Sequence, residues 1–310
     1  MTSREIVDPM ASVRAYLAAS SSSSTRRAYA SDWADFTTWC SQILEQPLPA
    51  LPETIARYLA QLADGGSKTS TIQRRIAALA AAHRAAGFDP PPTSAEGVRA
   101  TMRGIRRTLG ARQTRKAPTT AELLGRVLHN LPKTLQGLRD RAILLVSFAA
   151  ALRRSELVAL HVHHIERRPR GIVIHIAGSK TDQEGKGEQL PVPNGRQLRP
   201  VDALDAWLEA AGITEGPIFR EIDRHGKVGL TPLSGRSIAR IVKRAVKACG
   251  LDESIFSGHS MRAGFVTTAL ADKQDPLKVA KISRHKKIDT LRIYDRKEAD
   301  FDDHAGGGFL

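Results

Sequence analysis

The sequence has few of the residues that cross-link small secreted proteins or bind zinc. Only two of its 310 residues are cysteines, Cys40 and Cys249, and they lie far apart in the chain. Their number and spacing argue against a disulfide-rich scaffold and a cysteine-rich zinc site, and favour a reducing cytoplasm. Aromatic residues make up 5% of the chain, so leucine, alanine, isoleucine and valine must fill its cores.

Long apolar segments are also missing. No run reaches the ~20 residues that a membrane-spanning helix needs, so we expect no membrane partner. The N-terminus does not resemble a signal peptide, because the serine run at 20–24 lies between two helical patterns rather than before a cleavage site.

Acidic residues are outnumbered by basic ones. The chain has 47 lysines and arginines against 32 aspartates and glutamates, which gives a net charge of +15. A chain this basic usually binds a polyanion, and we expect the partner to be nucleic acid. A solubilising surface is the simpler alternative.

The first 110 residues have the apolar periodicity of a helical domain. The pattern predicts helices at residues 8–19, 25–43, 53–63, 67–86 and 95–109. In the second of these, Trp33, Phe36 and Trp39 share one face, and Arg26 and Asp32 lie on the opposite face. Residues 111–118 are basic without apolar periodicity, and we interpret them as a linker close to phosphates.

Residues 119–310 predict a second domain with a different pattern. Thr119 or Thr120 can cap its first helix, and residues 138–152 form a buried helix. Two strands follow at 171–176 and 189–192, with a turn at 178–187. Further helices are predicted at 196–211, 234–249, 260–271, 276–283 and 289–296. The fold class is therefore mainly α with a small β-sheet, in two domains.

Four segments of this second domain carry side chains suited to phosphodiester chemistry. Transesterification needs a nucleophile, donors around the non-bridging oxygens and an acid for the leaving oxygen. Arginines suit the second task because they bind phosphate bidentately and stay charged. Each segment alone is weak evidence for this chemistry, but the occurrence of all four in this order in a basic chain is specific for it. The candidates are Arg153, Lys180, His259, Arg262, His285 and Tyr294.

This ordered set resembles the tyrosine recombinases, or phage integrase family, whose motif reads Arg, Lys, His-x-x-Arg, His or Trp, then Tyr. The segments at 32–40, 71–73 and 102–106 resemble the SAM-like core-binding domain of Cre-type recombinases. Three positions depart from the pattern. His285 stands where Cre-type enzymes have tryptophan, Arg284 where glycine is common, and Ala150-Ala151 where Thr-Gly is usual.

The resemblance implies an enzyme that closes on DNA as a clamp and cuts it with Tyr294. It implies a 3′-phosphotyrosine intermediate, a Holliday junction and a homotetramer on two double-stranded DNA sites, without cofactor, metal or ATP. The tail after Tyr294 would pack into a neighbouring subunit, with a frayed end as the alternative. The protein would then be associated with the nucleoid.

The resemblance also implies a role for each side chain. Arg153 and Arg262 would hold the non-bridging oxygens, and His285 would donate a further hydrogen bond. His259 would accept the tyrosine proton. Lys180 would protonate the leaving oxygen, with Lys186 in the same turn as the alternative. Glu156 would hold the helix that follows Arg153.

Basic residues on the predicted helices are the candidates for contacts to DNA bases or phosphates. They are Arg27, Lys68, Arg74, Arg75, Arg236 and Arg240. Three other functions stay open: DNA relaxation like that of type IB topoisomerases, sequence-specific DNA binding without catalysis, and a metal site. The metal site would use His161, His163, His164 and His175. The target sequence and any accessory protein are not predicted.

Overall fold

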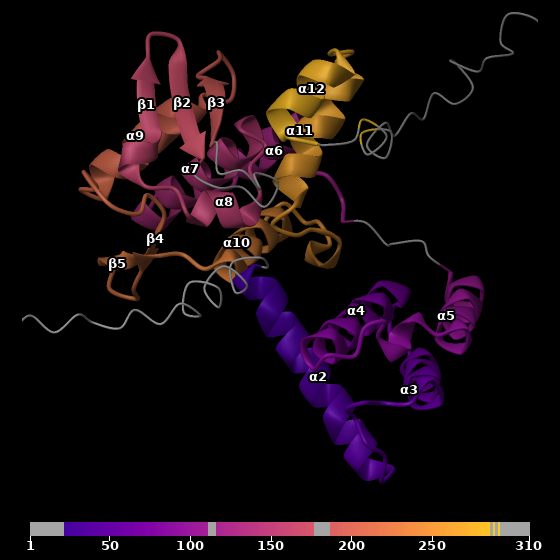
Figure 1. Ribbon diagram of the computed structural model, residues 1–310. Coiled ribbons are helices and arrows are strands. Elements are labelled where there is room, and N and C mark those ends of the chain that lie inside the picture. The colour runs from indigo at the N-terminus through magenta and orange to yellow at the C-terminus, as the bar shows by residue number, and fades with distance from the viewer. Residues whose placement is uncertain (1–21, 111–115, 177–186, 286–287, 289–290, 292–310) are drawn as a thin grey trace, which may run out of the picture. The chain divides into compact units, whose positions relative to one another are not determined.

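The computed structural model describes residues 22–110, 116–176, 187–285, 288 and 291 (Figure 1). The chain divides into two compact units, residues 1–114 and 115–310, each taken separately below. The mainly helical fold with small antiparallel sheets is confirmed. None of the helices in the described part of the chain is both long and apolar enough to cross a membrane.

The first unit is a helical bundle around one apolar core. Its elements are α2 (Ser23–Gln42), α3 (Pro52–Asp64), the 3-10 turn η1 (Pro92–Ser94), α4 (Thr69–Ala85) and α5 (Glu96–Leu109). The buried core includes Phe36, Leu59 and Leu79. Ser22 caps α2, since its hydroxyl accepts a hydrogen bond from the Thr25 amide at 3.2 Å. The helix predicted at 8–19 falls outside the described residues.

One expectation for α2 is wrong in this unit. The sequence places Asp32 opposite the aromatic face, but the structure buries it at 3% exposure. The reason is the helix spacing, because Asp32 is four residues before buried Phe36 and therefore lies on the same face of α2. Helix α4 packs against α2 and supplies Arg74 and Arg75 as partners there. A carboxylate can be buried there because two guanidinium groups compensate its charge.

The second unit surrounds the buried helix α7 (Leu135–Ala149), which packs against α9 (Pro200–Ala210) and α11 (Ser260–Ala271). Thr120, rather than Thr119, caps α6 (Ala121–His129) by accepting from the Leu123 amide. The remaining helices are α8 (Arg154–Val158), η2 (Val162–His164), α10 (Gly235–Lys247), η3 (Glu253–Ile255) and α12 (Pro276–Ser283). The helix predicted at 289–296 is almost wholly outside the described part of the chain.

Two small antiparallel sheets complete the second unit, where the sequence predicts one (Figure 1). The first has the order β1-β2-β3, with β1 (Ile165–Arg168), β2 (Gly171–Ile176) and β3 (Glu188–Pro193). In its register Ile174 pairs with Leu190. The second pairs β4 (Arg220–Ile222) with β5 (Val228–Pro232). Strand β1 is not predicted because three of its four residues are charged.

The end of the predicted linker belongs to the second unit. The Ala117 amide donates to the Ile255 carbonyl oxygen at 2.7 Å, and the Thr119 amide donates to that of Ser260 at 2.9 Å. This segment crosses α11 so closely that a Cβ atom at Gly264 would lie 1.8 Å from the Thr119 carbonyl oxygen. Glycine is therefore required at that position, and the crossing fixes the start of α11.

Candidate active site

The turn between α7 and α8 presents Arg153. Ala151 has a positive φ of 44°, which reverses the chain after α7. Arg153 is the first residue before α8, and buried Glu156 accepts hydrogen bonds from both its backbone amide and its Nη1 atom, each at 2.7 Å. One carboxylate thus caps the helix and orients the guanidinium. The predicted position of Glu156 beside Arg153 agrees with this geometry, and its role stays a prediction.

The start of α11 brings a second arginine to the same turn. Arg262 is 2% exposed, and its Nη1 atom donates to the Ala151 carbonyl oxygen at 2.9 Å. His259 immediately precedes α11, with its backbone amide held by the Ser257 hydroxyl at 3.1 Å. Arg153 and Arg262 are therefore linked through the α7–α8 turn, although 109 positions separate them in the sequence (262 − 153 = 109).

His285 lies just after α12, and its hydrogen bond with Ser283 selects the ring nitrogen that carries the proton. Ser283 donates its one hydroxyl proton to the Val279 carbonyl oxygen at 2.6 Å. The Ser283 oxygen therefore accepts from the Nδ1 atom of His285, which lies 2.7 Å away. In the neutral ring the proton is then on Nδ1, and Nε2 is a hydrogen-bond acceptor.

The electrostatics of this site keep both histidines neutral. Burial, followed by the positive charges of Arg262 and Arg153, lowers the pKa of His285 to about 4. The same three causes lower the pKa of His259, with burial the largest. Contacts tie the site together, because Arg262 donates to the Ala151 carbonyl oxygen and Arg153 Nη2 donates to the carbonyl oxygen of Arg284, the residue before His285. Lys180, its alternative Lys186 and Tyr294 are not among the described residues, so their positions stay predictions.

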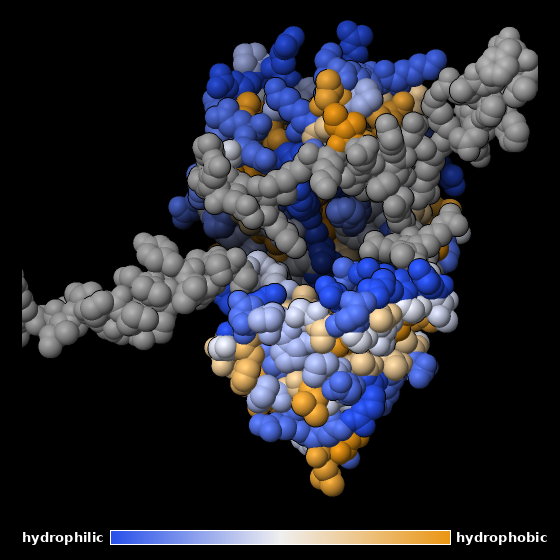
Figure 2. Space-filling model, turned by 45° about the vertical axis from the view of Figure 1, so that its right-hand side comes forward, coloured by the Kyte–Doolittle hydropathy of each residue, from blue (hydrophilic) through white to orange (hydrophobic). Residues whose placement is uncertain are grey.

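A basic stripe runs along α10. Arg236 and Arg240 are exposed on the helix face opposite buried Ile238 and Val242, as their spacing predicts. Arg244 and Lys247, which sequence reasoning did not single out, continue the same spacing, but they already pair with Asp140 at 2.6 Å and Glu253 at 3.3 Å respectively. Hydrophilic residues also cover much of the surface visible in Figure 2. The stripe is a candidate nucleic-acid contact, because aligned positive side chains suit a phosphate backbone.

Arg154 joins this stripe to the active site. Its side-chain stem lies over two glycines, since a Cβ atom at Gly235 would be 3.1 Å from its Nε atom and one at Gly258 would be 3.0 Å from its Cδ atom. The residue is exposed, and its charge contributes to the lowered pKa of His259. Sequence reasoning passed over Arg154, because nothing in the sequence shows which glycines meet it.

The four basic candidates of the first unit fall into two groups. Arg27 and Lys68 are exposed. Arg74 and Arg75 instead form ion pairs with buried Asp32, and Arg75 also donates to Tyr58 and to Asp35. The side chain of Arg75 is only 17% exposed. Its contacts favour a structural role over reading of DNA bases.

The histidine cluster does not have the arrangement of a metal site. The rings of His163 and His164 lie 4.2 Å apart, and His161 is next to both. His175 instead forms a 3.0 Å contact with the Glu166 carboxylate. In the part of the chain that the structure describes, no group of three or more histidine, cysteine or acidic side chains is placed to hold a metal ion.

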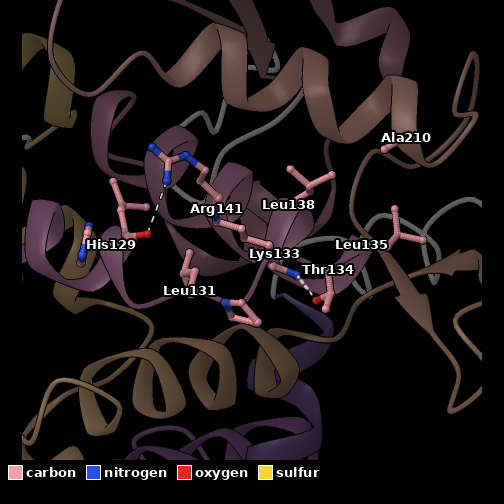
Figure 3. A pocket seen from close by; sticks show the side chains of 11 residues that line it. His129, Leu131, Lys133, Thr134, Leu135, Leu138, Arg141 and Ala210 are labelled. Atoms are coloured by element: carbon pink, nitrogen blue, oxygen red, sulfur yellow. Dashed lines mark hydrogen bonds between the residues drawn. The ribbon is translucent and has the colours of Figure 1, made fainter.

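A pocket of about 590 Å³ lies elsewhere in the second unit, between α6 and α7 (Figure 3). Apolar side chains such as Leu131, Leu135 and Leu138 line it, and Arg141 closes one side by donating to the Leu128 carbonyl oxygen at 3.4 Å. None of the candidate catalytic side chains lines this pocket. The clustered arginines and histidines, rather than this pocket, are therefore the candidate site.

Comparison with known proteins identifies the class to which this fold and site belong. The family model described as "Phage integrase family" matches residues 119–300, and "Phage integrase, N-terminal SAM-like domain" matches residues 14–86. The chain is 42% identical over 292 residues to an integrase/recombinase XerD homolog of Selenomonas ruminantium, covering 92% of this chain and 85% of the relative. It is 33% identical over 301 residues to a tyrosine recombinase of Synechococcus elongatus, covering 90% and 87%.

Solved structures share the fold. A XerH site-specific recombinase bound to a palindromic difH substrate superposes with a TM-score of 0.59 at 17% identity, covering 82% of this chain and 69% of that one. A lambda integrase dimer bound to a core site gives 0.58 at 18% identity, covering 86% and 89%. The chain belongs to the phage integrase family and is a site-specific recombinase of the tyrosine class.

Proposed function

We propose that this recombinase cuts and rejoins double-stranded DNA with Tyr294 as the nucleophile. The tyrosine oxygen forms a bond to the phosphorus, and the bond to the 5′-oxygen breaks. The leaving oxygen takes a proton and departs as a 5′-hydroxyl, while the strand stays attached as a 3′-phosphotyrosine. The phosphate is exchanged between two oxygens, so the reaction needs neither ATP nor an oxidant.

The two arginines supply the positive charge that this transition state needs. Arg153 and Arg262 are held by one turn, through Glu156 and the Ala151 carbonyl respectively. Guanidinium groups fixed before the substrate arrives stabilise developing charge on the non-bridging oxygens without reorganisation. The observation that carries the proposal is that one turn holds both arginines, with Arg262 at the Ala151 carbonyl oxygen and Arg153 at the Arg284 carbonyl oxygen next to His285.

Both histidines are neutral before DNA binds. Neutral His259 has a nitrogen available to accept the proton of Tyr294, whose ordinary pKa of ~10 requires such help. His285 presents Nε2 as an acceptor, because its Nδ1 proton is bound to Ser283. To donate to a phosphate oxygen, His285 must first gain a proton, which the negative charge of bound phosphate favours. Lys180 is the proposed acid for the leaving 5′-oxygen.

We also propose how the chain engages DNA. The α10 stripe and Arg154 contact the phosphates next to the scissile one, and residues 1–110 form the core-binding domain joined by the linker 111–118 to the catalytic domain 119–310. Four subunits on two DNA sites exchange strands through a Holliday junction. The proposed setting is the nucleoid of the cytoplasm, because the substrate is chromosomal or mobile DNA.

Covalent capture tests this function directly. Wild-type protein and Tyr294→Phe are incubated with sheared DNA from the source organism and denatured in detergent, and the DNA still attached to protein is sequenced. We expect attached DNA with the wild type alone, and the sequence reads give the target site. Equal, salt-sensitive binding by both proteins without attachment would favour a non-catalytic DNA-binding protein.

A second measurement separates recombination from relaxation by a topoisomerase. Two captured sites are placed on one plasmid as direct repeats, and products are resolved on a gel. Recombination predicts two smaller circles. Relaxed circles of unchanged size, with or without the sites, would instead support activity like that of a type IB topoisomerase.

A further inference from the structure

Arg284 is a buried arginine at the centre of the active-site network. Its side chain is 4% exposed, and its Nη2 atom forms an ion pair with the buried Glu156 carboxylate. Its Nη1 and Nη2 atoms also lie 3.4 Å from the carbonyl oxygens of Ala150 and Ala151. On its other side, the Nε atom is 3.1 Å from the carboxylate of Glu188 at the start of β3. Burial of this charge is costly, so the paired carboxylates must compensate it.

The backbone of Arg284 is as unusual as its side chain. It ends α12 with φ 56° and ψ 47°, a left-handed conformation that favours glycine. Glycine is the common residue at this position in the resembling family, and Ala151 has the second positive φ of the site, 44°. The chain therefore places a long side chain where a smaller one would be less strained. Such strain persists where the surrounding contacts over-determine it.

The contacts of Arg284 lead to both clamping arginines. Glu156 receives Arg284 on Oε2 and Arg153 on Oε1. The Arg284 backbone carbonyl oxygen accepts from Arg153 Nη2 at 3.2 Å. The Ala151 carbonyl oxygen, which lies 3.4 Å from Arg284, also accepts from Arg262 at 2.9 Å. One side chain thus touches the group that orients each arginine.

We infer that Arg284 is a positioning residue, which fixes the Glu156 carboxylate and the 150–151 turn so that Arg153 and Arg262 are held ready for the phosphate. The inference rests on the proposed function, because it assigns the arginines to the phosphate. Without Arg284, Glu156 keeps its bonds from the Arg153 amide on Oε2 and from Arg153 Nη1 on Oε1, but loses the second guanidinium that shares Oε2 and restrains the carboxylate. The Arg153 guanidinium then samples orientations that do not match the phosphate.

The first experiment needs no DNA. Arg284→Gly suits the left-handed backbone and removes the network without forcing a new conformation. Side-chain ¹⁵N–¹H NMR signals of Arg153, assigned by their loss in Arg153→Lys, are compared between the wild type and Arg284→Gly. We expect a slowly rotating, resolved Arg153 guanidinium in the wild type and an averaged signal in the variant. An unchanged Arg153 signal would overturn the inference.

The second experiment measures cleavage and binding separately on the captured site, well below the unfolding temperature of every variant. We expect Arg284→Gly to cut about 10- to 100-fold more slowly than the wild type, with DNA affinity within about threefold. Arg284→Lys restores the charge without the planar fork, so part of the rate should return. Glu188→Gln is the matched control, since it contacts Arg284 but neither Arg153 nor Glu156.

The two failures are distinguishable. A wild-type protein that never becomes attached to DNA contradicts the proposed function, and the NMR comparison still decides the role of Arg284. A wild-type protein that cuts, with Arg284→Gly cutting equally fast, contradicts the inference alone. An equal loss of cleavage rate in Glu188→Gln and Arg284→Gly would also contradict the inference, because the effect would then follow from the ion pair between Arg284 and Glu188 of β3.

Discussion

Each unit of this recombinase contains a buried carboxylate between two arginines, and the two clusters differ in the groups that surround them. In the first unit Asp32 meets Arg74 and Arg75, and Asp35 supplies a second carboxylate. Two positive charges therefore face two negative ones. In the second unit Glu156 meets Arg153 and Arg284, and Glu188 supplies a second carboxylate to Arg284. Arg262 reaches the same turn through the Ala151 carbonyl oxygen.

This difference separates a structural cluster from an anion site. In the first cluster the arginines hold α4 against α2, whereas in the second cluster Arg153 and Arg262 lie beside two neutral histidines, His259 and His285. Arginine number in the sequence does not distinguish the two, because both units are rich in arginine. The carboxylates brought near by folding decide which arginines are left for a ligand.

The same substitution in both clusters should have very different effects on catalysis. We expect Arg153→Lys to slow covalent DNA cleavage by about 100- to 1,000-fold, because lysine cannot keep the bidentate geometry toward phosphate and Glu156 together. Arg75→Lys, the matched control, should cleave at the wild-type rate and show a lowered unfolding temperature, because the lost contacts to Tyr58 and Asp35 are structural. Single-turnover cleavage and thermal unfolding provide the two measurements.

The opposite pattern would break the comparison. If Arg75→Lys slowed cleavage as much as Arg153→Lys at equal DNA occupancy, the balanced cluster would be part of the catalytic machinery. If Arg75→Lys mainly weakened DNA binding, the original expectation of a DNA contact at Arg75 would hold in spite of its ion pairs.

The burial of His285 beside Arg262 and Arg153 predicts a dependence of stability on pH. The pKa of His285 is depressed from 6.5 to about 4 in the folded protein, so between these values the unfolded chain binds the proton more readily. The free energy of unfolding should therefore fall as the pH falls from 7 to 4.5, and His285, whose partly exposed ring is screened by solvent, should account for about 1 kcal/mol of that loss. In His285→Gln the unfolding free energy should fall correspondingly less.

Denaturant unfolding of both proteins across this pH range measures the difference, which removes the contribution of all other groups. Parallel curves for wild type and His285→Gln would contradict the prediction. Adding a DNA duplex with the target site should reduce the pH dependence, because a phosphate beside Arg153 and Arg262 offsets the charge that disfavours protonation.

Local sequence patterns predicted much of this architecture. Residues close together in the sequence form the apolar stripes of α4 and α10 and place Gly87 just after α4. Helices lie where those stripes predict them. The ordered Arg, His-x-x-Arg and His motif likewise predicted which side chains gather. Strand β1 escaped prediction, because its charged residues pair with β2 at the edge of a sheet rather than bury an apolar face.

What the sequence could not show depends on contacts between distant segments. Asp32 is charged but lies on the buried face of α2, and its partner Arg74 is 42 residues away in the sequence (74 − 32 = 42). Arg284 looks like a departure from the family pattern, but it forms an ion pair with Glu156, which lies 128 positions earlier in the sequence (284 − 156 = 128). Periodicity reports the face of one element, whereas these pairs depend on which elements meet.

The smallest expected effect on DNA binding concerns Arg154. Its comparison with Arg84 contrasts two single exposed arginines rather than two clusters. Its stem lies over Gly235 and Gly258, and no ion pair of Arg154 is found in the described part of the chain. Arg84 is equally exposed to solvent but forms an ion pair with Asp89 at 3.5 Å. An arginine without a carboxylate partner is the better phosphate contact, because DNA need not displace an existing ion pair.

We therefore expect Arg154→Gln to weaken binding to the target duplex by about threefold to tenfold and to reduce the slope of log affinity against log salt by about one. Arg84→Gln should change neither quantity. Affinity measured between low and moderate salt gives both values, and use of the Tyr294→Phe background keeps cleavage from distorting them. Equal slopes for the two variants would show that a missing acidic partner does not mark a DNA contact in this chain. A loss of slope only in Arg154→Gln would extend the positive surface from the catalytic cluster to the first turn of α10, where the two glycines hold the side chain.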